Sequence, residues 1–103
     1  MKLPKKIKIL GIPYTVKYVN AMSKVGDEGD NFYGLIDHTK GTITAYGDNR
    51  PKEMIWRTIW HEILHALFES FDITADAKES ERIIQQLAPA INSVIIDNKF
   101  MEY

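Results

Sequence analysis

Residues 51–71 of this chain read PKEMIWRTIWHEILHALFESF, with no glycine and with proline only at the first position. Apolar residues recur on nearly every face of the helix that this run predicts, which indicates a central, buried helix. Pro51 suits the first helical turn, where its missing N–H costs nothing. Three ionisable residues, His61, Glu62 and His65, nevertheless lie in the middle of the run. Polar side chains inside a core need partners, so these three become the first candidates for a functional site.

His61 and His65 are four residues apart, which places them one turn apart on the same helical face, about 6 Å along the axis. Two imidazoles at this spacing can reach a single zinc ion (Zn2+), and Glu62 beside them can take a proton from a water molecule that zinc activates. The pattern predicts metal-ligating histidines and a catalytic glutamate. The alternative is a pair of hydrogen-bonded histidines, but a core rarely holds two histidines and a glutamate on one turn.

A catalytic zinc takes three protein ligands and leaves one position for water. The one remaining histidine, His38, falls in a predicted turn, where an exposed residue without a metal role is expected. The third ligand should therefore be a carboxylate from the next predicted helix. The candidates there are Asp76, Glu79 and Glu81.

Helical periodicity favours Glu81 among the three carboxylates, because it shares a face with most of the apolar residues of its helix: Ile84, Ala88, Ile91 and Ile95. Glu79 shares a neighbouring face with Ile83 and Leu87 and remains the alternative. Asp76 lies at the helix start, where a carboxylate favours the helix dipole.

The first half of the chain reads as strands. Alternating apolar residues predict strands within residues 7–9 and 14–18, with a turn or bulge at Gly11 and Pro13. Residues 20–31 read as a loop, and residues 33–37 and 42–46 as a hairpin around residues 38–41. We therefore expect an α+β fold in a single domain, residues 1–103. A small mixed or antiparallel sheet of three to four strands (about 5–47) packs on the 51–71 helix, and a second helix (about 76–97) has a kink or break near Pro89.

Composition agrees with a soluble globular protein of 103 residues, 45% hydrophobic and 26% charged. The chain has no cysteine, which excludes disulfides and cysteine–zinc sites. A net charge of −1 gives no strong signal for nucleic acid, and the N-terminal lysines (Lys2, Lys5, Lys6 and Lys8) read as a solvated strand edge. No stretch suggests a signal peptide or a membrane span, so we expect a cytoplasmic protein that is a monomer or a weak oligomer.

The segment 58–67, TIWHEILHAL, resembles the extended signature of the zincin metallopeptidases. The segment 81–88, ERIIQQLA, is similar to the segment that supplies the third ligand in several gluzincin families, and in that register the ligand is Glu81. The order of strands, hairpin and two helices also resembles the minimal gluzincins and the small ImmA/IrrE-like proteins of phages and prophages. Two positions depart from those families: Gln85 replaces a frequent acidic residue, and Asp72 replaces the glycine that usually ends the active-site helix.

These observations predict a zinc-dependent metallopeptidase acting on a peptide or protein substrate, with Glu62 as general base. Tyr33, Tyr46 and His38 are candidate donors to the oxyanion, and nothing in the sequence selects among them. The strand at residues 42–45 is a candidate edge for binding an extended peptide, and an internal strand is the equal alternative. The alternative function is a zinc-stabilised regulatory or interaction module that turns nothing over.

Overall fold

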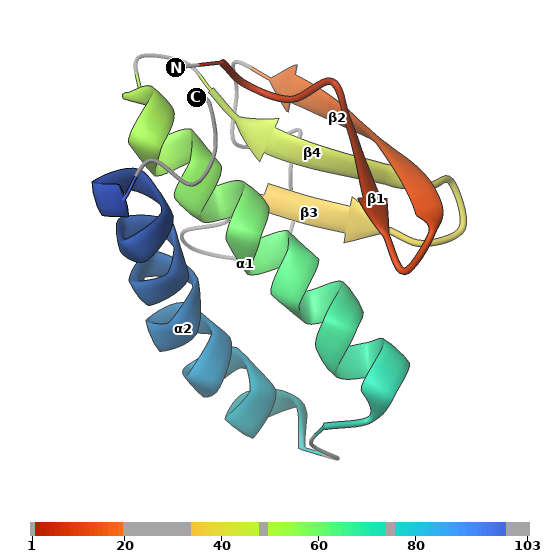
Figure 1. Cartoon of the computed structure of the whole chain (residues 1–103). Coiled ribbons are helices and arrows are strands. Elements are labelled where there is room, and N and C mark those ends of the chain that lie inside the picture. The colour runs from red at the N-terminus through yellow and green to blue at the C-terminus, as the bar shows by residue number, and fades with distance from the viewer. Residues whose placement is uncertain (1, 20–33, 48–49, 74–75, 99–103) are drawn as a thin grey trace.

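The computed structural model describes residues 2–19, 34–47, 50–73 and 76–98, and confirms the predicted α+β fold. The predicted loop at residues 20–31 and Tyr33 lie outside the described residues. The elements follow in the order β1 (Lys6–Ile9), β2 (Ile12–Val19), β3 (Gly34–Asp37), β4 (Thr42–Tyr46), α1 (Lys52–Phe71) and α2 (Ala77–Asn98) (Figure 1).

A tight turn joins β1 and β2, which pair in antiparallel fashion. Leu10 and Gly11 form the turn, with φ angles of 51° and 80°. Two consecutive positive φ angles match the twist of a two-residue hairpin. Pro13 was expected in the turn but lies inside β2, opposite Lys8, close to the start of the strand, where proline is tolerated.

The four described strands form one mixed sheet in the order β1-β2-β4-β3. β4 runs parallel to β2, with Ile43 opposite Val16, and antiparallel to β3, with Ile43 opposite Ile36. The hairpin predicted from residues 33–37 and 42–46 is confirmed for the described strands, β3 and β4. Of the two alternatives for residues 42–45, the internal strand is confirmed and the edge strand is wrong, because β4 is paired on both sides and β3 ends the sheet among the described strands.

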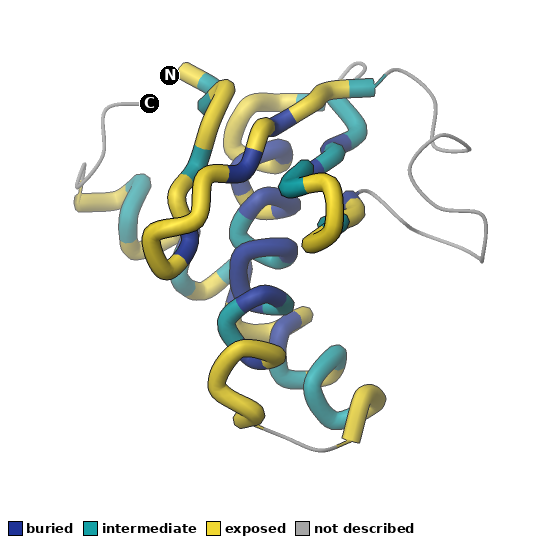
Figure 2. Tube along the Cα trace, turned by 90° about the vertical axis from the view of Figure 1, so that its right-hand side faces the viewer, coloured by how far each residue is buried: buried dark blue, intermediate teal, exposed yellow. Residues whose placement is uncertain are grey.

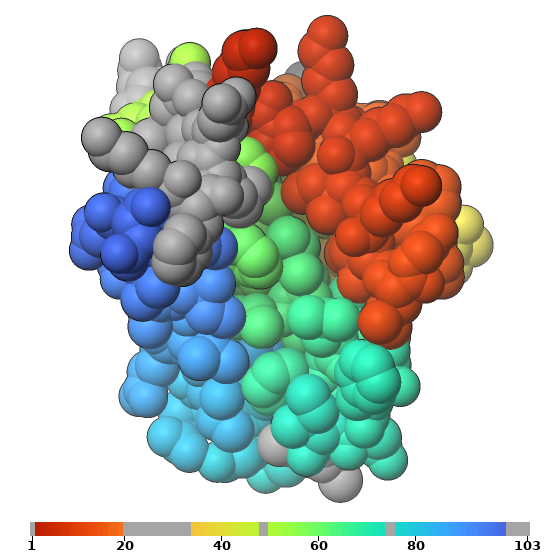
Figure 3. Space-filling model, viewed as in Figure 1, coloured from red at the N-terminus to blue at the C-terminus, as the bar shows by residue number. Residues whose placement is uncertain are grey.

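Helix α1 lies between the sheet and α2 (Figures 1 and 3). Alternate strand residues point toward this helix, and the dark blue of Figure 2 shows that burial is concentrated along α1 and the strands above it. The three largest fully buried side chains represent the three layers: Ile43 in the sheet, Ile59 in α1 and Ile84 in α2. Burying each of these side chains stabilises the fold by about 2 kcal/mol. Helix α1 therefore packs against the sheet on one side and against α2 on the other.

Helix α1 ends at Asp72, where the backbone turns out of the helical conformation. This residue adopts the left-handed conformation (φ 51°, ψ 47°), and its N–H donates to Glu69 O. The N–H of Ile73 donates to Phe68 O at 3.1 Å. An aspartate therefore occupies the position and conformation in which glycine is the usual residue.

Helix α2 runs without interruption through Pro89, so the expectation of a break is wrong, and the alternative of a kink stays a prediction. Pro89 has no N–H to donate to Gln85 O, but Gln85 lies on an exposed part of the helix where water can serve that carbonyl. Neither helix of the described residues is long and apolar enough to cross a lipid bilayer.

Candidate metal centre

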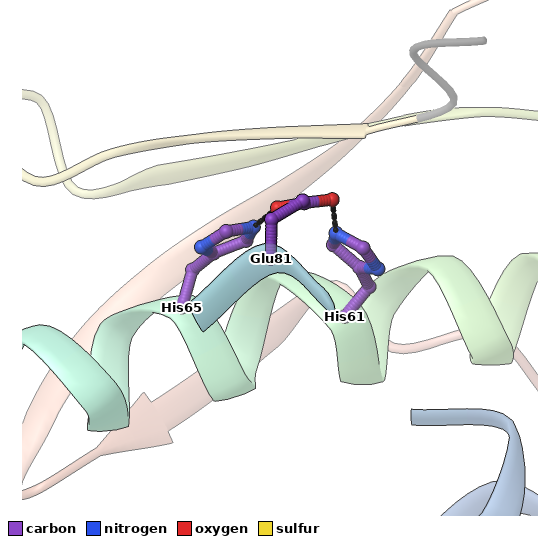
Figure 4. A group of neighbouring side chains, drawn as sticks. All are labelled: His61, His65 and Glu81. Carbon is purple, nitrogen blue, oxygen red and sulfur yellow. Dashed lines mark ion pairs between the residues drawn. The ribbon is translucent and has the colours of Figure 1, made fainter. Parts of the chain in front are cut away.

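The side chains of His61, His65 and Glu81 converge between α1 and α2 (Figure 4). The Nε2 atom of His61 lies 3.1 Å from Glu81 Oε1, and the Nε2 atom of His65 lies 2.8 Å from Glu81 Oε2. One donor atom from each residue lies within 4.8 Å of the other two. The side chains are 24%, 31% and 41% exposed, so the group is partly shielded and still open to a ligand.

The two helices bring this group together for local reasons. The four-residue spacing on α1 sets both imidazoles on one face, and their rings lie 4.9 Å apart. On α2, Ile84 and Ala88 are fully buried, so the face that packs against α1 also carries Glu81. The packing of this face of α2 against α1 therefore brings Glu81 to the histidines.

The two competing carboxylates have other partners. Glu79 is paired with the exposed Arg82 on its own helix, and this ion pair lowers the pKa of Glu79. Asp76 Oδ1 accepts a hydrogen bond from the backbone N–H of Lys78 at 2.9 Å, so it caps the first turn of α2. Neither residue belongs to the converging group.

Two imidazole nitrogens and a carboxylate oxygen form a donor set that suits zinc. Burial lowers the pKa of His61, as does the neighbouring His65, while Glu81 opposes this change. A lowered pKa favours the neutral imidazole, which is the form that binds a metal. Within the described residues no further histidine, aspartate or glutamate joins these three as a fourth ligand. The donor set therefore leaves space for another ligand. The residues present therefore fit a metal ion.

Glu62 lies beside this group and outside it. It is 6% exposed and packs beneath β3 at Gly34. A Cβ atom on Gly34 would lie 3.0 Å from Glu62 Oε2 and 2.6 Å from Thr58 Cγ2, so only glycine permits this approach of strand and helix. Burial, with a smaller contribution from the charge of Glu81, raises the pKa of Glu62 to about 8.

A cleft of about 1050 Å³ runs over the site between β3, α1 and α2. Its lining includes Glu62 and the three converging residues, and the backbone of β3 borders it from Gly34 to Ile36. Tyr46 and His38, two of the three candidate oxyanion donors, also line it, whereas Tyr33 lies outside the described residues.

His38 has two partners that the sequence did not indicate. Tyr14 Oη lies 2.9 Å from His38 Nδ1, and His38 Nε2 lies 2.7 Å from Glu69 Oε2. These contacts connect β2, the β3–β4 turn and the last turn of α1. His38 is not part of the group that converges on a common point.

Gln85, which replaces an acidic residue of the resembled families, contacts the candidate ligand directly. Its Nε2 atom donates to Glu81 Oε1 at 3.2 Å. A glutamine four residues after a carboxylate on one helix is well placed for such a bond, so the spacing was a usable signal. Gln85 therefore helps to orient Glu81.

Comparison of the chain with models of known protein families, with curated proteins and with solved structures finds no match.

Proposed function

We propose that this chain is a small zinc-dependent metallopeptidase of the gluzincin type. The observation that carries the proposal is the convergence of His61, His65 and Glu81 in a cleft, with the buried Glu62 next to them. A purely structural zinc site usually closes its fourth position with protein, and the described residues offer no such ligand here.

The proposed ligands are His61 Nε2, His65 Nε2 and one carboxylate oxygen of Glu81. Zinc bound there supplies a Lewis acid that polarises a peptide carbonyl and acidifies a water molecule. The carboxylate of Glu62 takes the proton from the attacking water and passes it to the leaving amine nitrogen.

The substrate is proposed to be an extended peptide lying along β3. Because β3 has a partner strand on one side only among the described strands, main-chain groups on its other side are available to a peptide. Gly34, Leu35 and Ile36 border the same cleft as the proposed ligands. The proposal gives β3 the peptide-binding role for which residues 42–45 were one candidate.

The experiment compares zinc-loaded wild type, Glu62→Gln and Glu79→Gln on a mixture of synthetic peptides, with products identified by mass spectrometry and zinc content measured in parallel. We expect Glu62→Gln to keep its zinc and lose cleavage, and Glu79→Gln, a matched glutamate outside the site, to keep both. Cleavage by Glu62→Gln at the wild-type rate would contradict the proposal. Zinc binding without cleavage by any of the three proteins would favour the zinc-stabilised interaction module instead.

A further inference from the structure

Arg57 is a cationic residue in the wall of the cleft. The proposed mechanism does not use this residue. It lies on α1, four residues before His61 and therefore one turn away on the same side of the helix. Its side chain is exposed and makes no hydrogen bond or ion pair with any residue that the structure describes. A guanidinium carries five N–H donors, so Arg57 offers an unused binding group beside the site.

The absence of an ion pair is informative because a suitable carboxylate is close in sequence. Glu53 precedes Arg57 by four residues on the same helix, which is the favourable order for an acidic and a basic side chain. Both residues are exposed, yet they form no ion pair, and Arg57 lines the cleft instead. The guanidinium is thus left for a ligand.

Charge is distributed unevenly along the cleft. Arg50 lies at the same end as Arg57, and its guanidinium donates to Tyr46 O, Met54 O and Thr58 Oγ1. The opposite end carries a carboxylate, Glu69, which is 69% exposed and pairs with His38. Arg57 and Glu69 are twelve residues apart on one helix, about 18 Å along its axis. The cleft therefore has a positive end and a negative end, with the candidate metal ligands between them.

The direction of β3 indicates which end of a bound peptide would lie at each end of the cleft. Gly34, the first residue of β3, packs on Thr58 and Glu62, while His38, just after the strand, contacts Glu69. β3 thus runs in the same direction as α1. A peptide pairing with β3 in antiparallel fashion would enter at Glu69 and end near Arg57. Its amino end would face a carboxylate and its carboxyl end a guanidinium, so hydrogen bonding and charge favour the same orientation.

We propose that Arg57 binds a substrate carboxylate on the C-terminal side of the cleaved bond, either an acidic side chain or the terminal carboxylate of a short peptide. This inference rests on the proposed function and adds a substrate class to it. Arginine binds carboxylates with two parallel hydrogen bonds, which fixes orientation as well as providing attraction.

The test uses zinc-loaded Glu62→Gln protein, so that bound peptides stay intact. The probes are four fluorescein-labelled heptapeptides, alanine-rich with a central phenylalanine. They carry aspartate or asparagine two residues after the phenylalanine, each with a free or an amidated C-terminus. Fluorescence anisotropy measures the affinity of each probe. The four probes separate a side-chain carboxylate from a terminal one.

We expect at least one of the two carboxylates to raise affinity about tenfold over the amidated asparagine peptide, as for a charge-assisted hydrogen bond of about 1.4 kcal/mol. Adding Arg57→Gln should remove this gain, and adding Arg57→Glu should turn it into a preference for the neutral peptide. Arg82→Gln, which removes an exposed arginine that pairs with Glu79, is the matched control and should keep the gain. Zinc content and far-ultraviolet circular dichroism verify that each variant is folded and loaded.

Equal affinity for the four peptides, a gain that survives Arg57→Gln, or no binding at all would overturn the inference. A second measurement, cleavage of the same peptides by zinc-loaded wild type, separates its failure from that of the proposed function. Binding with a carboxylate gain but without cleavage would contradict the peptidase and leave the carboxylate site standing. Cleavage without any carboxylate preference would contradict the carboxylate site and leave the peptidase proposal standing.

Discussion

The buried carboxyl group of Glu62 should make the stability of the metal-free protein depend on pH. Burial raises its pKa from 4.5 to about 8 in the folded protein. The unfolded chain, where the group titrates normally, releases its proton at lower pH than the folded chain does. The Glu62 carboxyl group therefore contributes a loss of stability as pH rises from about 4.5 to about 8.

The size of this effect follows from the two pKa values. Each pH unit between them costs about 1.4 kcal/mol of unfolding free energy, so the loss from pH 5 to pH 7 is about 2 to 3 kcal/mol. Glu62→Gln cannot ionise and lacks this loss. The free energy of unfolding of Glu62→Gln should therefore rise relative to wild type by about 2 to 3 kcal/mol between these pH values. The packing cost of the amide is present at both pH values and cancels.

Urea unfolding in the presence of a chelator, followed by the fluorescence of Trp56 and Trp60, measures this difference directly. Glu79→Gln is the control. Because Arg82 lowers the pKa of Glu79, the stability that this carboxylate provides is lost only as pH falls into the acid range. Its difference from wild type should stay nearly constant from pH 5 to pH 7. A difference between Glu62→Gln and wild type that is equally constant would refute the account of Glu62 as a buried, proton-holding carboxyl group.

Three further variants test other parts of the structure. Gly34→Ala should force β3 away from Thr58 and Glu62, reducing peptide cleavage at least tenfold while zinc content, measured by atomic absorption, stays near one per chain. Unchanged cleavage would show that the contact is not tight. Asp72→Gly should stabilise the protein by about 1 kcal/mol in thermal unfolding, because glycine adopts the left-handed conformation without strain. A destabilised Asp72→Gly variant would contradict the left-handed conformation of residue 72 at the end of α1. Gln85→Ala should weaken zinc affinity about tenfold by releasing the Glu81 carboxylate, and an unaltered affinity in a zinc titration would remove Gln85 from the site.

The helical half of the fold and the converging residues were accessible from sequence because helical periodicity is strict. The apolar positions of α2 predict which side faces α1, and Ile84 and Ala88, both fully buried, lie there with Glu81. Leu87, which shares the face of Glu79, is 37% exposed. Residue spacing therefore favoured Glu81 but left Glu79, on a neighbouring face, as the alternative.

The arrangement of the sheet was less accessible. Alternation along a strand predicts which side chains point inward, but it does not say which strands are neighbours. The parallel pairing of β2 with β4 places β4 inside the sheet and β3 at its end among the described strands, and the sequence could not decide between an edge and an internal position for residues 42–45. The close contact of Gly34 with Glu62 depends on that arrangement, so no local signal marks this glycine.

The central claim is that His61, His65 and Glu81 bind one zinc ion, and calorimetric titration of zinc into metal-free protein tests it most directly. Wild type and Glu79→Gln should each bind one zinc per chain with the same affinity, whereas Glu81→Ala should lose at least tenfold in affinity, because only two ligands remain. If wild type binds no zinc, or if Glu81→Ala binds it as tightly as Glu79→Gln does, the claim is contradicted.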